Sequence, residues 1–213
     1  EKEIEHILIS GRCESDETDL LDTYKIKSKI IYLDDVQRSV FLFRDIKSIF
    51  ALYLILRKLK PAIVHTHLSK AGVLGRVAAK ISNPKVVLIH TFHGHLLSGY
   101  FNQFKVKIII GIEKFLSQFT NTLIAVSKDV QEKYSILGIG KRSEWLVINP
   151  GIRNTLQTDQ SEIRNSALTS KSFHLIWIGR FAEIKNPKLA IEIFDLLQSH
   201  SEFTFQLTMI GDG

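Results

Sequence analysis

Hydrophobic residues fall in short, nearly continuous runs along the chain, separated by longer segments with a helical repeat. The runs are rich in β-branched and aromatic residues, which predicts strands at residues 4–10, 29–33, 62–67, 85–92, 122–127, 145–150, 173–179 and 205–211. They show little alternation of polar and apolar positions, which is typical of strands in a parallel sheet that is covered on both faces.

Between most of these runs, apolar residues recur every three or four positions. This spacing predicts helices at residues 42–60, 69–82, 127–138 and 186–200. Pro61 ends the first helix, and Ser127 is a suitable N-cap for the third. Asn186 and Pro187 form a cap and first turn for the last. Strands linked by helices predict a doubly wound α/β fold.

A polar segment interrupts this alternation. Residues 153–172 lack apolar periodicity, and a new strand begins at Phe173. The interruption predicts an N-terminal domain at 1–152, an interdomain linker at 153–172 and the beginning of a second domain at 173–213. The second domain would hold a single βαβ unit, which is too little for a stable sheet. We therefore expect the sequence to be an internal fragment of a longer two-domain protein.

The composition limits the class of protein and the kinds of site that the chain can contain. Of the 213 residues, 45% are hydrophobic, as in an ordinary globular protein. The single cysteine, Cys13, excludes an internal disulfide and a cysteine-built zinc site, and it fits a reducing compartment. The longest apolar run, within residues 48–57, is far shorter than the roughly 20 residues that span a bilayer, so no transmembrane helix is expected.

The net charge of +6 predicts an attraction to anions: nucleic acid, an acidic membrane surface or phosphorylated substrates. No arginine-rich run or interleaved aromatic motif is present, so nucleic acid is not an expected partner. Residues 96–119 mix large apolar residues with Lys105, Lys107 and Lys114. Such a segment suits the surface of an anionic membrane, although its residues slightly favour a helix that packs on the core and has a solvated face.

Five of the eight histidines lie between His65 and His95. Ligands of open α/β sheets bind beyond the carboxyl ends of the strands. Polar and glycine residues gather at the predicted strand ends: His65, His67, His90, His93, Gly94, Ser127, Asn149, Gly151, Gly179, Arg180 and Gly211. The sequence does not predict a metal site, because the histidines at 90, 93 and 95 alternate in direction and no carboxylate follows them.

A second pattern points to phosphate. Gly179 ends a strand, Arg180 follows it, and Lys185 comes just before the Asn-capped helix. A glycine turn, a forked guanidinium and an ammonium group beside a helix N-terminus form a suitable site for a diphosphate. Solvated charges in a loop remain the alternative.

Six segments carry a resemblance to a known family: AIVHTHLSKAGVLGRVAA, HTFHGHLLSGYF, LIAVSKDVQEKYSILGIG, VINPGI, IGRFAEIKNPKLAIEIF and MIGDG. In order and spacing they resemble the signature segments of glycosyltransferase family 4, especially of its bacterial members in exopolysaccharide, capsule and lipopolysaccharide synthesis. The resemblance implies the GT-B fold: two Rossmann-like, doubly wound parallel-sheet domains. The N-terminal domain would bind mainly the acceptor, and the C-terminal one mainly the nucleotide-sugar donor.

The resemblance also implies roles for individual residues. Arg180 and Lys185, together with Gly179, would hold the donor diphosphate, and His93 would be the catalytic histidine close to the transferred sugar. The further candidates for contacts with the substrates are His67, Gly94, His95, Ser127 and Asn149. The expected co-substrate is a UDP-sugar, with no metal or other cofactor, and the expected acceptor is a saccharide or a lipid-linked sugar. The enzyme would transfer the sugar with retention, in the cytoplasm or on the inner face of the cytoplasmic membrane.

Two family features are missing from the sequence. One is the glycine-rich turn after the first strand of the N-terminal domain, and the other is the Glu-x7-Glu motif that grips the donor sugar and ribose. We therefore expect the N-terminal domain to lack its first strand, the C-terminal domain to be truncated and this fragment to be inactive alone. Two alternatives remain: a GT-B sugar-nucleotide 2-epimerase, and a non-catalytic, transferase-like binding subunit.

Overall fold

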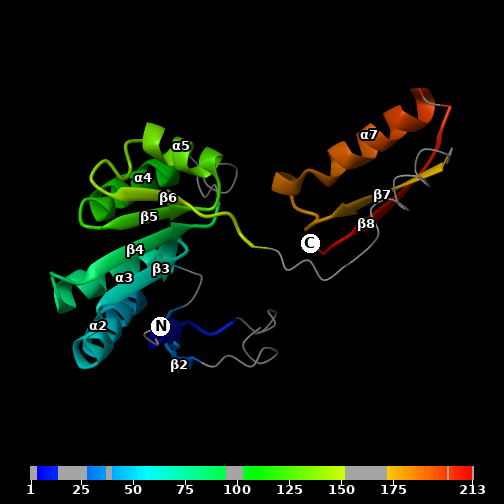
Figure 1. Cartoon of the computed structure of the whole chain (residues 1–213). Helices are drawn as coiled ribbons and strands as arrows, with labels where there is room; N and C mark the ends of the chain where they lie inside the picture. Colours follow the sequence, from blue (N-terminus) through cyan, green and yellow to red (C-terminus); the bar gives the residue numbers. More distant parts are fainter. Residues whose placement is uncertain are drawn as a thin grey trace. The chain divides into compact units, whose positions relative to one another are not determined.

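The computed structural model describes residues 4–13, 28–36, 40–94, 103–151, 172–200 and 202–212. The chain divides into two compact units, Glu1–Pro150 and Gly151–Gly213 (Figure 1). Most of the predicted linker lies outside the described residues, except Ser172, which belongs to the first strand of the second unit. Each unit is described by itself.

The first unit contains a four-stranded parallel sheet. Its strands are β3 (Ile63–His67), β4 (Val87–Phe92), β5 (Thr122–Ala125) and β6 (Glu144–Val147), and they lie in this order across the sheet. Two further strands, β1 (Ile7–Ser10) and β2 (Lys29–Tyr32), pair in parallel with each other. The predicted α/β class with parallel strands is confirmed.

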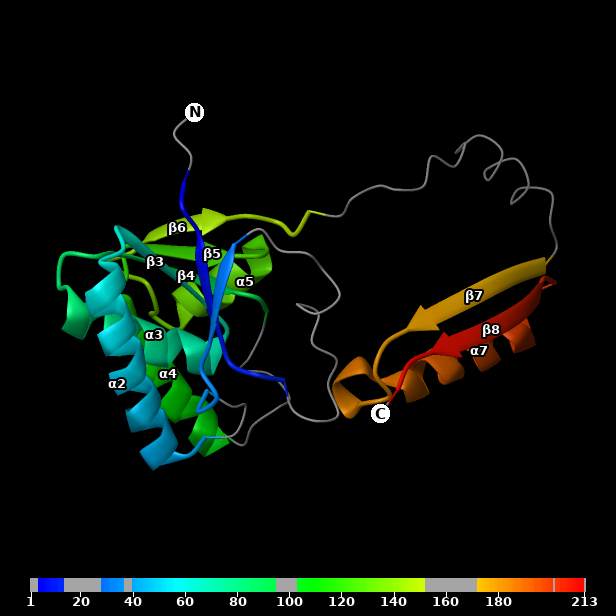
Figure 2. The same cartoon turned by 90° about the horizontal axis from the view of Figure 1, so that it is seen from below.

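The helices of this unit are α2 (Leu42–Leu59), α3 (Ser69–Ser82), α4 (Gln103–Ser117) and α5 (Lys128–Ile136). The first three are neighbours, with α3 between α2 and α4 (Figure 2). One buried apolar cluster joins α2 and α3 to Leu88 of β4, and a second joins α5 to Phe92 of β4. Because alternate residues of a strand point to the same side, both clusters lie on one face of the sheet. On the opposite face, Ile63 and Val87 are exposed.

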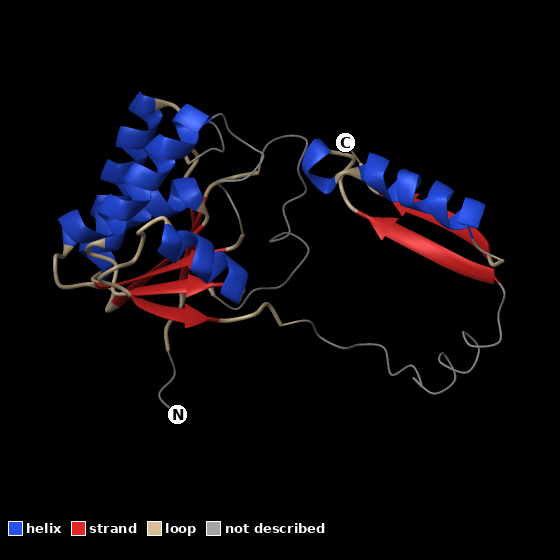
Figure 3. Cartoon of the chain, turned by 90° about the horizontal axis from the view of Figure 1, so that it is seen from above, coloured by secondary structure: helices blue, strands red, loops and turns tan. Residues whose placement is uncertain are grey.

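The second unit contains one βαβ motif. Strand β7 (Ser172–Ile178) leads through the short 3-10 helix η1 (Glu183–Lys185) into α7 (Pro187–His200), and β8 (Thr204–Ile210) returns parallel to β7 (Figure 3). Asn186 caps α7 as predicted, because its side-chain oxygen accepts a hydrogen bond of 3.2 Å from the Leu189 N–H. The two strands bring the turns that follow them together.

Candidate active site

Three histidines meet at the carboxyl ends of β3 and β4. The Nδ1 of His67 lies 2.9 Å from the Nε2 of His93, and the Nε2 of His65 lies 2.7 Å from the Thr91 hydroxyl. The rings of His65 and His67 are 4.2 Å apart. Strand register produces this grouping, because His67 lies opposite Thr91 and His93 follows two residues later. The sequence-based expectation that these residues share one sheet edge agrees with this arrangement.

The contact between His67 and His93 restricts their protonation. A hydrogen bond between two imidazoles needs one N–H donor and one lone pair, so at least one ring is neutral. Burial, followed by the charge of His93, lowers the pKa of His67. Burial, followed by the charges of His67 and His93, lowers the pKa of His65. We therefore expect His65 and His67 to be neutral at pH 7. The pair offers an imidazole that can accept a hydrogen bond from a ligand hydroxyl or donate one to it.

His90 lies on the opposite face from this group and is buried. Its Nδ1 is 2.9 Å from the Thr66 hydroxyl, and its ring packs edge-on against Phe92. Burial, followed by the charge of Arg76, lowers the pKa of His90 to about 2. A buried histidine that contacts Thr66 and Phe92 under a helix has a packing role, so His90 does not belong to the exposed group.

The helix that follows β3 begins with a strained residue. Leu68 has φ 62° and ψ 164°, a region of backbone space that is essentially restricted to glycine. Leu68 lies directly between His67 and the first turn of α3, so the strain is stored where the histidine is positioned. Nothing in the sequence signals this conformation, because leucine has no preference for it.

Close packing explains the glycines of the segment SKAGVLGRVAAK. A Cβ atom on Gly72 would lie 2.5 Å from Cε1 of His90, and one on Gly75 would lie 2.8 Å from Cγ2 of Thr66. Between these contacts and α4 lies a buried ion pair, in which the Arg76 Nη2 donates to both carboxylate oxygens of Glu113 at 2.8 and 2.7 Å. This part of the motif fixes α3 to the sheet.

The remaining candidates of the first unit lie at the same edge of the sheet. The backbone oxygen of Gly94 accepts a hydrogen bond of 3.4 Å from the Tyr134 hydroxyl. The Ser127 hydroxyl accepts one from the Val130 N–H, and it therefore caps α5. Asn149 is exposed after β6. His95 lies outside the described residues. No group of three or more His, Cys, Asp or Glu side chains in the described part of the chain is arranged to hold a metal ion.

The phosphate candidates of the second unit share the turn between β7 and α7. Arg180 and Lys185 are both exposed, and neither has an acidic partner among the described residues. The stem of Lys185 lies over Gly179, since a Cβ atom there would be 3.8 Å from the Lys185 Cγ. Gly211, after β8, has no room for a side chain, because its Cβ would collide with the Gly179 carbonyl. The turn thus presents two cations, without acidic partners in the described ranges, beside the N-terminus of α7.

The chain belongs to glycosyltransferase family 4, whose family model matches residues 11–154. It is 26% identical over 191 residues to the capsular polysaccharide biosynthesis glycosyltransferase CapM of Staphylococcus aureus, covering 86% of this chain and 50% of the relative. It is 33% identical over 178 residues to the UDP-Gal:alpha-D-GlcNAc-diphosphoundecaprenol alpha-1,3-galactosyltransferase of Escherichia coli, covering 73% of this chain and 44% of that protein. The chain thus spans about half the length of the curated relatives it matches.

Solved structures support the same fold. A glycosyltransferase from Rickettsia africae ESF-5 superposes with a TM-score of 0.59 at 20% identity, over 97% of this chain and 52% of that one. A putative UDP-N-acetylglucosamine 2-epimerase from Listeria monocytogenes gives a TM-score of 0.54 at 13% identity, over 89% and 50%. At these identities the likeness shows the fold alone, and transferases and epimerases share it.

Proposed function

We propose that the protein containing this chain is a retaining glycosyltransferase of cell-surface polysaccharide synthesis. It transfers a sugar from a nucleoside diphosphate sugar to a saccharide or a lipid-linked acceptor. The family match over residues 11–154 is the observation that carries the proposal. The relatives from Staphylococcus aureus and Escherichia coli, named for capsular polysaccharide biosynthesis and for a galactosyl transfer, support the process and the class of donor.

Arg180 and Lys185 bind the diphosphate of the donor in this proposal. Both cations are exposed and lack acidic partners among the described residues, and the N-terminus of α7 lies beside them. A guanidinium fork and an ammonium group neutralise the charge that builds up on the departing diphosphate. With these two cations the leaving group needs no metal ion, so we propose a reaction without a metal or other cofactor. The proposed donor is a UDP-sugar.

His93 contacts the transferred sugar through the ring nitrogen that is not bonded to His67. His67 holds the ring by their 2.9 Å contact and fixes which nitrogen of His93 is free. In this scheme the acceptor proton passes to the leaving phosphate, so neither histidine is the general base. Gly94 lets the backbone approach the ligand, and Ser127 lies at a strand end of the same edge that faces the nucleotide.

Two other functions fit parts of these observations. A sugar-nucleotide 2-epimerase shares the fold, but it needs carboxylates for acid and base chemistry, and the histidine group has none among its described partners. A non-catalytic binding subunit would also keep the fold. A Glu-x7-Glu motif in the complete reading frame would favour the transferase over both.

We further propose that the protein works in the cytoplasm, on the inner face of the cytoplasmic membrane. Among the described residues, no helix is long and apolar enough to cross a membrane. Helix α4 carries exposed Phe104, Ile108 and Phe115, together with lysines, an arrangement that suits an anionic lipid surface. Flotation with anionic vesicles tests this. The Phe104→Ser/Phe115→Ser variant should float less than the wild type, and equal flotation of the two proteins with anionic vesicles would contradict the proposal.

Calorimetric titration with uridine diphosphate tests the proposed donor site. The protein expressed from the complete reading frame should bind the nucleotide, and Arg180→Ala and Lys185→Ala should each weaken binding about tenfold to a hundredfold, since each removes a charge-assisted contact. Arg57→Ala and Lys85→Ala remove exposed cations elsewhere and should leave the affinity unchanged. Equal affinity of all variants would contradict the assignment of Arg180 and Lys185 to the donor site. Absence of binding by the wild type, with guanosine and adenosine diphosphates also inert, would favour the binding subunit.

A further inference from the structure

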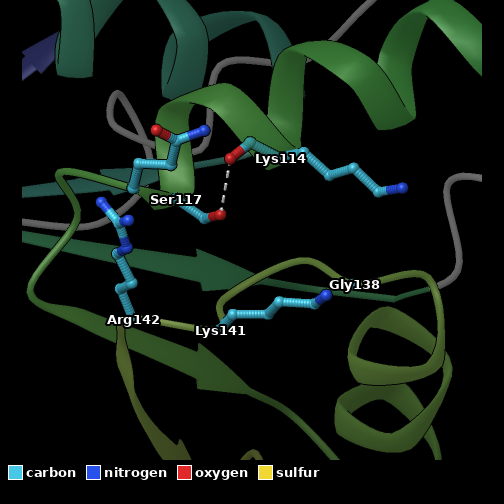
Figure 4. A pocket seen from close by; sticks show the side chains of 6 residues that line it. Lys114, Ser117, Gly138, Lys141 and Arg142 are labelled. Atoms are coloured by element: carbon cyan, nitrogen blue, oxygen red, sulfur yellow. Dashed lines mark hydrogen bonds between the residues drawn. The ribbon is translucent and has the colours of Figure 1, made fainter.

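A pocket of about 320 Å³ lies far from the histidines, at the opposite edge of the four-stranded sheet. It is formed by the C-terminal end of α4 and by the turn that precedes β6 (Figure 4). Because α4 ends before β5 begins, both walls lie at the amino ends of the strands. The lining residues are Lys114, Ser117, Gln118, Gly138, Lys141 and Arg142. None of them has a role in the proposed transfer reaction.

Hydrogen bonds to Ser117 join the two walls of the pocket. The Ser117 hydroxyl donates to the Lys114 backbone oxygen at 3.0 Å and accepts from the Gly140 N–H at 3.1 Å. The Ser143 hydroxyl donates to the Ser117 backbone oxygen at 2.9 Å. Ser117 is buried, and Gly140, at φ 75°, packs against Trp145 so closely that a Cβ would lie 2.5 Å from the indole nitrogen. The pocket is therefore formed before any ligand arrives.

Three positively charged side chains line this rigid frame. The side chains of Lys114 and Lys141 both pass Gly138, since a Cβ at that position would lie 3.5 Å and 3.4 Å from their Cε atoms. Arg142 stands on the other side of the pocket (Figure 4). In the described part of the chain, none of these three cations has an acidic partner. The negative end of the α4 dipole accounts for Lys114 in its last turn, but Lys141 and Arg142 belong to the turn.

We propose that this pocket binds a phosphate group. Two ammonium groups and a guanidinium around a preformed cavity match the charge and the several acceptor oxygens of a phosphate, with the guanidinium able to donate two parallel hydrogen bonds. An anion there also relieves the repulsion between Lys114 and Lys141. The pocket contains neither Arg180 nor Lys185, and the proposal does not depend on the protein being a transferase.

Two sources could supply the phosphate: a soluble phosphate compound or the headgroup of an anionic lipid. The surface beside the pocket favours the lipid. Phe115 follows Lys114 on α4 and is 62% exposed, and Phe104 and Ile108 continue the apolar side of the helix. A headgroup in the pocket would leave its acyl chains against this apolar strip, whereas a soluble phosphate would gain nothing from it.

Calorimetry with inorganic phosphate tests the site in the protein from the complete reading frame. The background carries Arg180→Gln and Lys185→Gln, so that the proposed donor site does not contribute. Phosphate should bind, and Lys141→Gln/Arg142→Gln should weaken binding about tenfold or more. Arg57→Gln/Lys58→Gln removes the same charges from the exposed end of α2 and should leave the affinity unchanged. Equal weakening in both double variants would mean that net charge alone acts, and it would overturn the proposal.

Vesicle binding separates the two sources. Phosphatidylcholine vesicles containing phosphatidylglycerol should retain the protein and release it when Lys141 and Arg142 are both glutamine, while the Arg57/Lys58 control stays bound. Loss of phosphate binding without loss of vesicle binding would support the pocket with a soluble ligand. If the Lys141→Gln/Arg142→Gln variant binds both inorganic phosphate and vesicles as the wild type does, the pocket is not a phosphate site.

Discussion

Strands β3 and β4 carry histidines on two faces of one sheet, and the burial of these histidines differs between the faces. His90 lies under α3 with 1% of its surface exposed, and its pKa is lowered to about 2. His67 and His93 stand exposed at the strand ends and are hydrogen-bonded to each other. All three come from the same dense cluster in the sequence. The difference shows that position relative to the covering helices, and not histidine density, decides which imidazole can meet a ligand.

The buried face holds the largest expected effect. Arg76→Met leaves the Glu113 carboxylate buried without a partner, which should lower the free energy of unfolding by about 3–5 kcal/mol. The double variant Arg76→Met/Glu113→Leu should recover much of this loss. The measurement is urea unfolding. Breaking the exposed pair of Lys188 and Glu192 by Lys188→Met should cost less than about 0.5 kcal/mol. Similar losses in the free energy of unfolding for Arg76→Met and Lys188→Met would contradict the expected difference between a buried and an exposed ion pair.

The histidines of the exposed face should determine the rate of sugar transfer. In the protein from the complete reading frame, His93→Ala should lower kcat for sugar transfer by about a hundredfold while the stability is unchanged, because an exposed side chain contributes little to packing. His67→Ala should lower kcat less than His93→Ala, since it acts through His93. His90→Leu should mainly change stability. Loss of activity in His90→Leu without unfolding would contradict the division between the faces.

The pH dependence of stability sharpens the same comparison. His90 stays neutral in the folded protein, whereas the unfolded chain binds a proton there below the ordinary value of 6.5. Its contribution is therefore present above pH 6.5 and is lost as the pH falls, by about 2 kcal/mol between pH 7 and pH 5. The lowered pKa values of His65 and His67 act in the same direction. Urea unfolding at both pH values should show a weaker dependence in His90→Leu than in the exposed control His6→Leu.

The smallest expected effect concerns Leu68, the residue that joins β3 to α3. Leu68→Gly should relieve the strained backbone and raise the free energy of unfolding by about 1 kcal/mol, after the greater freedom of glycine in the unfolded chain is subtracted. If the strain positions His67, transfer activity should fall in the same variant. Lys60→Gly, at a left-handed position that ends α2, should stabilise the protein without changing activity. Destabilisation by Leu68→Gly would mean that the leucine side chain outweighs the strain.

Much of the fold could be predicted from local patterns. The apolar runs predict the strands and the helical repeats predict most of the helices, because each element depends on the spacing of its own residues. The strand-end rule brought His67 and His93 to one edge. The pairing of Arg76 with Glu113 could not be predicted, because 37 residues separate them and only the packing of α3 on α4 joins them. The strain at Leu68 was missed since it depends on how β3 meets α3.

The phosphate pocket also escaped sequence analysis. Lys114, Lys141 and Arg142 do not form a run in the sequence, and only the hydrogen bonds of Ser117 bring the end of α4 to the turn before β6. The sequence pattern predicts only that the lysines of α4 belong to an amphipathic segment. Their grouping with charges from a distant turn is a tertiary feature, so no local spacing signals it.

The glycines of α3 have a consequence for motion. Gly72 and Gly75 seat the helix against His90 and Thr66 without room for a methyl group. A screw motion of α3 by one residue would therefore place a side chain where each glycine now lies. We therefore expect α3 to keep its position against β3 and β4. A rearrangement that accompanies substrate binding is then expected to move α3 together with these two strands.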